Sequence, residues 1–455
     1  MKKYKTGIWL ITNDQRINVN ENIENAVRDC EQVLSIFVWD EKLKRSSSNS
    51  KQASFFYQSL SELNKLLLPL NDGLGLQMYE GDTTSIIEKI INTHNAEALY
   101  VQNDYTPVFS NFINEIKEKI NVETSLSGYL SNPNSILKED GSPYLTFSSF
   151  ARAWFRTGPE GKTFSEIPKF KSTKIIIKQN FFPSNQKFIF TPVRSEALKR
   201  LLQFLDSSLN SYNVGRNMLD TDGTSMISPY LRSGIISINE AFNLGMSRDE
   251  SLTSPGIKSW INELLWREFN MYIMHHFPEI ISSSFNNKLR DYPWEMNNDY
   301  LNSWKNGLTG YPIVDSCMKQ LTNLGWMHNR GRMIVASFLT KDLFIDWREG
   351  EKWFMENLVD ADTASNVGGW QWTAGSGVDA APYFRIFNPI TQGKKFDPDG
   401  KFVKYWINEL NDIPSNIVHE PWLSEDEVKS PYDSPIVDHA QARAKALLIF
   451  NSLKK

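Results

Sequence analysis

The hydrophobic period of this chain changes once, near Ser195, and no other feature constrains the fold as strongly. Before this point, short apolar runs alternate with longer segments of helical period, a pattern typical of a parallel sheet with crossover helices. After it, apolar residues recur with the period of an amphipathic helix. The sequence therefore predicts an α/β domain followed by an all-α domain.

We assign residues 1–130 to the Rossmann-like α/β domain, residues 131–194 to an interdomain connector and residues 195–455 to the helical domain. The expected strands are Gly7–Ile11, Val33–Trp39, Leu76–Tyr79 and Ala98–Val101. No Gly-x-Gly-x-x-Gly follows the first of them, so the usual dinucleotide fingerprint is missing. Six prolines between residues 131 and 194 predict an irregular connector without a long helix. The expected C-terminal helices are Ala197–Leu209, Ser259–Met274, Ile313–Leu324, Arg330–Phe344, Gly350–Val359 and Ala440–Leu453.

Composition excludes several classes of protein. A length of 455 residues suits two domains, and a net charge of −4 means that any nucleic-acid surface must be a local basic patch. The two cysteines, Cys30 and Cys317, are far apart, which argues against a disulfide framework and for a reducing compartment. Neither a signal peptide nor an apolar run of membrane-spanning length is present. We expect a cytoplasmic monomer.

Hydrolytic and metal-dependent chemistry are disfavoured by what the chain lacks. The six histidines are scattered, and neither His-Glu-x-x-His nor Gly-x-Ser-x-Gly occurs, so no metal site is expected. The unusual feature is tryptophan: eleven of the 14 lie at or after Trp260. Polar residues interleave with these rings in four segments of the helical domain.

In the first two segments, each pattern has a functional and a plain structural interpretation. The hydroxyls of Thr224, Ser225 and Ser228 either receive a phosphate or simply cap a helix. Glu263, Trp266 and Arg267 share one helical face. They either stack on a base and pair with a phosphate, or form a salt-bridged surface helix.

The other two segments follow in the chain. Asn329 and Met333 fall on one helical face, and a buried Arg332 needs a carboxylate, for which Asp360 is a candidate. Farther along, Asp362 and Asn366 offer polar groups to a ligand. The glycine pair 368–369 lets the backbone approach a planar molecule closely.

The run Asn366-Val367-Gly368-Gly369-Trp370-Gln371-Trp372 and its surroundings resemble the FAD-binding domain of the photolyase and cryptochrome family. The similarity is greatest to class I cyclobutane pyrimidine dimer (CPD) photolyases. It is almost continuous from Thr309–Pro312 to His419–Trp422 and includes Trp326–Arg330, Ile345–Glu351 and Arg385–Pro389.

This resemblance implies an FAD cofactor held among the helices. The implied FAD-binding residues are Tyr212, Thr224, Ser225, Met226, Ile227, Ser228, Trp260, Arg332, Asp360, Ala361, Asp362 and Asn366. Arg332, paired with Asp360, would flank the isoalloxazine, and Asp362 would meet its polar edge. Asn366 would face flavin N5 and favour the fully reduced anion. Plant-type cryptochromes usually place Asp there, so Asn366 favours repair over signalling.

The resemblance also implies UV-damaged DNA as the partner. Glu263, Trp266 and Trp372 would contact a flipped-out dimer, while Asn329 and Met333 would distinguish it from the (6-4) photoproduct, whose photolyases have His at both positions. The candidate phosphate clamps are Arg216, Arg267, Arg330 and Arg385. Trp370, Trp347 and Trp294 match the relay that re-reduces oxidised flavin in light.

The chain departs from the family pattern in several places. Thr12–Arg16 retains only Asp14 and Arg16 of the usual sequence after the first strand. Folate-binding relatives have an Asn-Glu pair after the fourth strand that helps hold the antenna, whereas the matching place here is near Val108-Phe109, so the identity of the antenna chromophore is open. Methenyltetrahydrofolate is the first expectation for the antenna. Deazaflavin, FMN or another second flavin are the alternatives, and the last alternative is that no antenna is bound. Gly331 replaces a large apolar residue, and Val367 replaces an Asn. The alternative functions are a cryptochrome-like photoreceptor and an FAD-containing DNA-binding protein without repair activity.

Overall fold

The computed structural model describes residues 2–126, 128–159, 166–175, 181, 183, 186–382, 385–423, 432 and 434–453. The chain forms two compact units. Unit 1 comprises Met1–Leu209, Ser225–Pro278 and Val359–Thr363, and unit 2 comprises Asn210–Thr224, Glu279–Leu358 and Ala364–Lys455. Each unit collects segments that are distant in sequence, and the boundaries at residues 130 and 194 stay a prediction.

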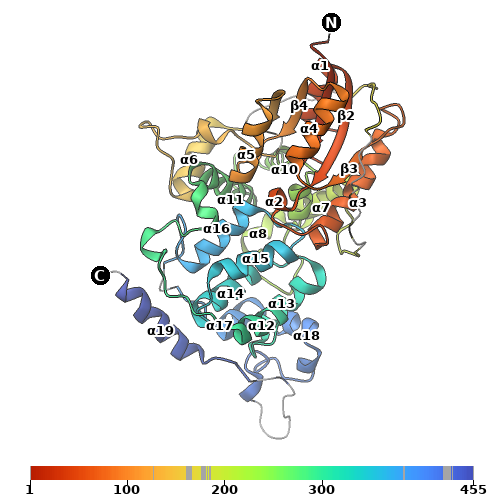
Figure 1. The fold of residues 1–455 in the computed structure, drawn as a ribbon. Helices are drawn as coiled ribbons and strands as arrows, with labels where there is room; N and C mark the ends of the chain where they lie inside the picture. Colours follow the sequence, from red (N-terminus) through yellow and green to blue (C-terminus); the bar gives the residue numbers. More distant parts are fainter. Residues whose placement is uncertain are drawn as a thin grey trace. The chain divides into compact units, whose positions relative to one another are not determined.

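A five-stranded parallel sheet forms the centre of the N-terminal part of unit 1 (Figure 1). Its strands are β1 (Tyr4–Ile11), β2 (Cys30–Trp39), β3 (Gln77–Glu80), β4 (Ala98–Gln102) and β5 (Asn121–Ser125), in the order β3-β2-β1-β4-β5. The parallel sheet predicted from the sequence is thus confirmed. The fifth strand was missed because it is polar and mostly exposed, so it lacks the apolar run that signals a buried strand.

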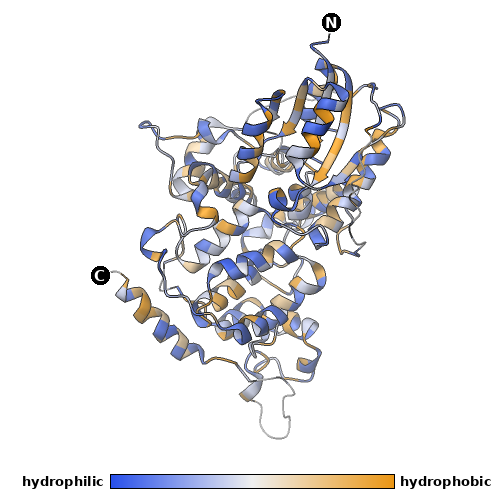
Figure 2. Ribbon diagram, viewed as in Figure 1, coloured by the Kyte–Doolittle hydropathy of each residue, from blue (hydrophilic) through white to orange (hydrophobic). Residues whose placement is uncertain are grey.

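Five helices accompany these strands: α1 (Glu21–Asp29), α2 (Glu41–Lys44), α3 (Lys51–Leu67), α4 (Thr83–His94) and α5 (Pro107–Ile116). Alternate side chains of the strands, such as Ile8 and Leu10, pack in one core with Ile87 of α4 and Phe112 of α5. Strand β2 accordingly carries much of the hydrophobic colour in Figure 2. After β3 the chain returns to the other side of β1, which makes β1 and β4 neighbours.

The remaining helices of unit 1 are α6 (Phe147–Thr157), α7 (Arg194–Ser207), α9 (Ser228–Ser233), α10 (Ile238–Met246) and α11 (Pro255–His276). Helix α6 lies in the stretch predicted to be irregular. That expectation is wrong for Phe147–Thr157, because Pro143 and Pro159 lie outside the helix and leave its interior free of proline. Its buried Phe150 packs on Phe269 and Tyr272 of α11.

Unit 2 is helical: among the described residues after Ser125, no β-strand occurs. Its helices are α8 (Tyr212–Gly215), α12 (Asn298–Asn306), α13 (Pro312–Leu324), α14 (Asn329–Ser337), α15 (Trp347–Asn357), α16 (Thr363–Ala374, whose first residue belongs to unit 1), α17 (Pro389–Phe396), α18 (Lys401–Trp406) and α19 (His439–Ser452). The predicted combination of a Rossmann-like domain and a helical domain is confirmed.

The helix predicted over Arg330–Phe344 is shorter than expected. Helix α14 ends at Ser337 and continues as a π-helical turn, η5 (Phe338–Asp342). A Cβ on Gly331 in α14 would lie 2.8 Å from Cys317 Sγ in α13, so this glycine permits close packing of the two helices. No helix in the described part of the chain is both long and apolar enough to cross a membrane.

Candidate functional site

In unit 1, two of the residues predicted to bind FAD contact each other directly. Ser228, at the start of α9, donates a hydrogen bond from Oγ to Asp360 Oδ2 at 2.6 Å. Nearby in the sequence, Ser225 accepts a hydrogen bond from Trp260 Nε1 at 3.3 Å. Met226 between them has a positive φ of 47°, an uncommon conformation for a residue with a side chain. This loop therefore has a specific geometry in which its hydroxyls are positioned by an acid and an indole.

The segment around Ala361 is held by two residues that the sequence did not single out. Gln52 Nε2 and Arg232 Nε donate to the Ala361 carbonyl at 2.7 and 2.6 Å. Arg232 Nη1 also lies 3.6 Å from Asp362 Oδ2. Arg232 is only 7% exposed, so it fixes a backbone carbonyl and a carboxylate from inside unit 1. In the sequence, only the position of this arginine among the apolar residues of the stretch 230–236 could have indicated that it is buried.

Helix α11 carries Glu263, Trp266 and Arg267, all half-buried. The Trp266 ring stacks on Phe147 of α6, with centroids 4.0 Å apart and an interplanar angle of 6°. Phe147 thus supports one face of the indole, a contact that no sequence motif indicated. The stack favours a fixed orientation for Trp266.

Arg267 is engaged within unit 1. Its Nη1 donates to the Gly128 carbonyl at 2.8 Å, and its guanidinium lies over the Tyr129 ring at 5.6 Å. Next to it, burial raises the pKa of Glu268 to about 7. These contacts position the guanidinium, and its predicted role as a phosphate clamp stays a prediction.

In unit 2, Asn329 and Met333 lie side by side on α14, as their spacing predicted. Asn329 Nδ2 is 3.8 Å from Met333 Sδ, and Asn329 is exposed. Arg332, on the same helix, donates from Nε to the Met327 carbonyl at 2.9 Å. The pairing of Arg332 with Asp360 joins residues of different units and stays a prediction.

Three of the predicted phosphate clamps act on one another electrostatically. Burial lowers the pKa of Arg330, and the positive charges of Arg216 and Arg385 lower it further. Arg330 donates to the neutral amide of Asn217 and lies over the Phe396 ring at 4.3 Å. Cations that repel one another attract an anion strongly, so this part of unit 2 suits phosphate.

The backbone near Arg385 is held by one side chain of the π-helical turn and by the last residue of α14. Lys341 Nζ donates to the Arg385 carbonyl at 3.0 Å, and Ser337 Oγ accepts from the Phe387 amide at 3.2 Å. Lys341 is 1% exposed, and its burial lowers the pKa of its ammonium group to about 8. Sequence reasoning missed both positioning residues, because a lysine and a serine in a helical segment are ordinary.

Asn366 of α16 has its amide orientation fixed by Glu351. Its Nδ2 donates to the Glu351 carbonyl at 2.9 Å and to Glu351 Oε1 at 3.0 Å. Both partners are acceptors, so the amide oxygen remains to accept a hydrogen bond from elsewhere. This acceptor therefore fits a ligand that presents an N–H group, as a reduced flavin does at N5.

The predicted relay tryptophans differ in burial. Trp370 is 2% exposed and packs edge-on against Phe354 and Trp304, at centroid distances of 5.1 and 6.1 Å. A Cβ on Gly350 would lie 2.0 Å from the Trp370 ring, so this glycine makes room for the indole. Trp347 is buried, whereas Trp294 and Trp372 are half-buried.

The remaining predicted ligands are placed as follows. Tyr212 is buried, and the Arg216 guanidinium lies 5.9 Å from its ring centroid. Thr224 is half-buried and Ile227 is buried. The roles assigned to individual residues stay predictions.

Comparison with known proteins identifies the family to which this chain belongs. A model of the FAD-binding domain of DNA photolyase matches residues 260–452, and a DNA photolyase model matches residues 7–169. The deoxyribodipyrimidine photo-lyase of Escherichia coli is 34% identical, with 98% of each chain covered. The chain belongs to the DNA photolyase family. A photo-lyase of the same name from Alkalihalophilus pseudofirmus is 33% identical over 98% of this chain and 97% of its own length.

Solved structures agree with this membership. A bacterial class III photolyase from Agrobacterium tumefaciens has a TM-score of 0.89 at 32% identity, covering 100% of this chain and 98% of its own. A Synechocystis cryptochrome has a TM-score of 0.88 at 26% identity, with 99% of each chain covered. An archaeal photolyase from Sulfolobus tokodaii, solved with two FAD molecules, has a TM-score of 0.82 at 28% identity, covering 98% of this chain and 100% of its own. The predicted family, an enzyme of the photolyase type with an FAD-binding domain, is confirmed.

Proposed function

We propose that this protein repairs cyclobutane pyrimidine dimers in DNA by light-driven electron transfer from reduced FAD. The observation that carries the proposal is the pair Asn329 and Met333, whose amide nitrogen and sulfur lie 3.8 Å apart on α14. A neutral amide beside a soft thioether suits a dimer that needs no proton from the protein. The (6-4) photolyases that this region resembles have two histidines instead.

The residues predicted to bind FAD have distinct roles in this proposal. Bound FAD supplies an electron that light makes available to the lesion. Thr224, Ser225 and Ser228 bind the phosphate side in this proposal, with Tyr212 and Trp260 adjacent. The amide oxygen of Asn366 accepts from the flavin N–H, because its nitrogen already donates to Glu351. That hydrogen bond favours the reduced form, in which the N–H is present.

The DNA contacts divide into phosphate binding and lesion binding. Arg216, Arg330 and Arg385 bind phosphates, since their charges reinforce one another. Trp266, supported from behind by Phe147, and Trp372 pack on the flipped-out dimer, and Glu263 hydrogen-bonds its carbonyls. Flipping costs a few kcal/mol, and it costs least for a damaged base pair, which contributes to selectivity.

A single assay tests the proposal. Purified protein with chemically reduced FAD is irradiated with blue light in the presence of one oligonucleotide that carries a cyclobutane dimer and another that carries a (6-4) photoproduct. We expect restored thymines from the first lesion only, and none in the dark. Repair of the (6-4) lesion would overturn the assignment of Asn329 and Met333. Binding of FAD without repair of either lesion would support a cryptochrome-like photoreceptor or a non-repairing DNA-binding protein.

We also infer a cytoplasmic monomer, in which the buried thiols Cys30 and Cys317 stay reduced. As antenna, methenyltetrahydrofolate remains our first expectation, with deazaflavin and FMN as alternatives. The absorption spectrum of chromophores released by denaturation distinguishes these molecules.

A further inference from the structure

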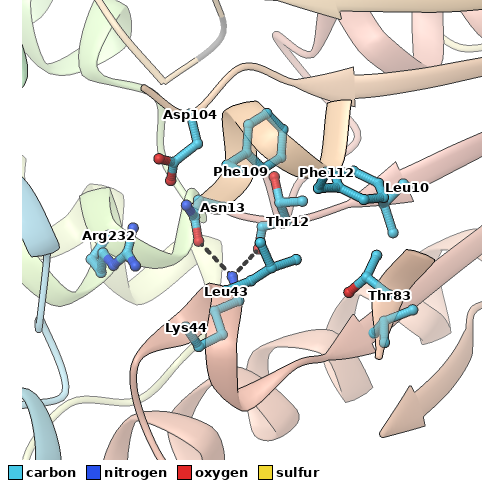
Figure 3. Close-up of a pocket in the computed structure, with 11 residues that line it drawn as sticks. Leu10, Thr12, Asn13, Leu43, Lys44, Thr83, Asp104, Phe109, Phe112 and Arg232 are labelled. Carbon is cyan, nitrogen blue, oxygen red and sulfur yellow. Dashed lines mark hydrogen bonds between the residues drawn. The ribbon is translucent and has the colours of Figure 1, made fainter. Parts of the chain in front are cut away.

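The sheet of unit 1 contains a pocket at the place where α/β proteins commonly bind ligands. Strands β1 and β4 are neighbours, although β2 and β3 come between them in the sequence. At such a reversal of strand order, a crevice opens beyond the carboxyl ends of the strands. In this protein the residues that line the crevice include the apolar Leu10, Phe109 and Phe112 and the polar Thr12, Asn13 and Thr83 (Figure 3).

The Lys44 side chain extends into this pocket. Its Nζ donates to Asn13 Oδ1 at 2.9 Å and to the Thr12 carbonyl at 3.4 Å, as the dashed lines in Figure 3 show. The ammonium group also lies over the rings of Phe56 and Phe37, at 4.9 and 5.8 Å from their centroids. Lys44 is 6% exposed, and this burial lowers the pKa of its ammonium group to about 7.

The position of Lys44 is fixed by the short helix that ends on it. Asp40 caps α2: its Oδ1 accepts from the amides of Lys42 and Leu43, at 2.9 and 3.3 Å. The other oxygen of the same carboxylate accepts from the amide of Thr83, the first residue of α4, at 2.9 Å. One carboxylate therefore ties α2 to α4 and fixes the backbone from which the Lys44 side chain extends.

The space left beside Lys44 is small. The cavity volume is about 30 Å³. Sites for molecules of drug size are cavities of about 300–1,000 Å³, so an isoalloxazine or deazaflavin ring does not fit. The hydroxyls of Thr12 and Thr83 are buried without a hydrogen-bond partner among the described residues, as expected where a water molecule is the occupant.

We propose that the Lys44 side chain fills the pocket beside β1 and β4 and thereby excludes a tricyclic chromophore from it. This chain then carries no second flavin or deazaflavin at that place. The inference concerns unit 1 alone and does not depend on which lesion the protein repairs.

The first test uses the wild-type holoprotein. It is incubated with riboflavin or FMN in excess, freed of unbound ligand by gel filtration and denatured, and the flavins are then counted per chain. We expect one flavin per chain, the FAD of the helical domain, with or without this incubation. A second flavin retained in stoichiometric amount would overturn the proposal.

The second test removes the Lys44 side chain. Lys44→Ala leaves a larger cavity with apolar walls, and an engineered apolar cavity of about 150 Å³ is known to bind a molecule as small as benzene. We therefore probe with phenol, using ligand-observed NMR of the FAD-loaded protein. Lys44→Ala should bind phenol measurably, whereas Lys44→Met, which keeps a side chain of similar length, should bind no more than the wild type.

A surface control, Lys65→Ala in α3, accounts for any general effect of losing a lysine, since this side chain is 68% exposed. Equal phenol binding by Lys44→Ala and Lys44→Met would show that the side chain is not what closes the pocket. If Lys44→Ala fails to fold, as judged by its FAD content, the flavin count of the wild type still decides the question.

Discussion

Two groups of cationic side chains, one in each unit, differ in how deeply they are buried. Lys44 and Arg232 of unit 1 are buried and bonded to oxygens of their own unit, including the carbonyls of Thr12 and Ala361. Arg330 of unit 2 also donates to a neutral amide and lies in the field of other cations, Arg216 and Arg385, but it is only half-buried. A fully buried cation whose acceptors are built into the fold contributes to structure. A half-buried cation in a group of cations contributes to binding an external anion.

The largest effect should come from removing an internal cation. Arg232→Met leaves the Ala361 carbonyl without its 2.6 Å donor and Asp362 without its neighbouring charge. Breaking such contacts typically costs about 2–4 kcal/mol. We expect a loss of that size in the free energy of unfolding, measured by urea titration, together with a lower FAD content, because the segment 360–362 is then held less firmly.

A surface arginine provides the control for this variant. Arg28 pairs with Asp29 at 2.8 Å, but its side chain is 63% exposed. Exposed pairs contribute at most about 1 kcal/mol, so Arg28→Met should change the unfolding free energy little. Equal losses of unfolding free energy in Arg232→Met and Arg28→Met would mean that Arg232 stabilises the fold no more than an ordinary surface arginine does.

The next largest effect is a dependence of the unfolding free energy on pH, caused by the titration of Lys44. Burial lowers the pKa of its ammonium group from 10.5 to about 7. Between these values the unfolded chain binds the proton more than the folded protein does, so stability rises with pH through this window. The gain is at most about 1.4 kcal/mol per pH unit. We expect the unfolding free energy of the wild type, relative to Lys44→Met, to increase from pH 7 to pH 10.

The comparison with Lys44→Met cancels other titrating groups and any effect of pH on FAD binding. Wild-type and variant curves that run parallel between pH 7 and pH 10 would show that Lys44 keeps an ordinary pKa. In that case the ammonium group is hydrated, and the pocket is more open than its contacts indicate.

The internal cations also show where sequence reasoning ends. The alternation of apolar runs predicted the parallel sheet, and the run Asn366–Trp372 predicted an FAD-binding domain. The partners of individual residues were not predictable, because they are brought together from far along the chain: Ser228 and Asp360 are 132 residues apart, and Gln52 and Ala361 are 309 apart. Lys44 lies in the charged stretch 40–45, which is typical of an exposed helix. Its inward contacts are with Asn13 and Thr12, which are 31 and 32 residues away along the chain.

The smallest effect, but the most specific, concerns the cations of unit 2. Arg330→Gln removes one of three charges that act on one another, while its neighbours Asn217 and Phe396 remain. We expect DNA affinity to fall by about tenfold, a loss of about 1.4 kcal/mol. Because one phosphate contact is lost, the slope of log K against log salt should decrease by about 1, for damaged and undamaged duplexes alike.

The measurement for this variant is a binding titration at several salt concentrations, with Lys65→Gln as an exposed control that should leave the slope unchanged. The same loss of affinity at every salt concentration, with an unchanged slope, would mean that Arg330 acts through packing against Phe396 and not through its charge. A slope that decreases only with damaged DNA would place Arg330 at the lesion. Arg330 would then still bind an external partner, but that partner would be the lesion and not a phosphate, because phosphate contacts are shared by all sequences and lesion contacts are not.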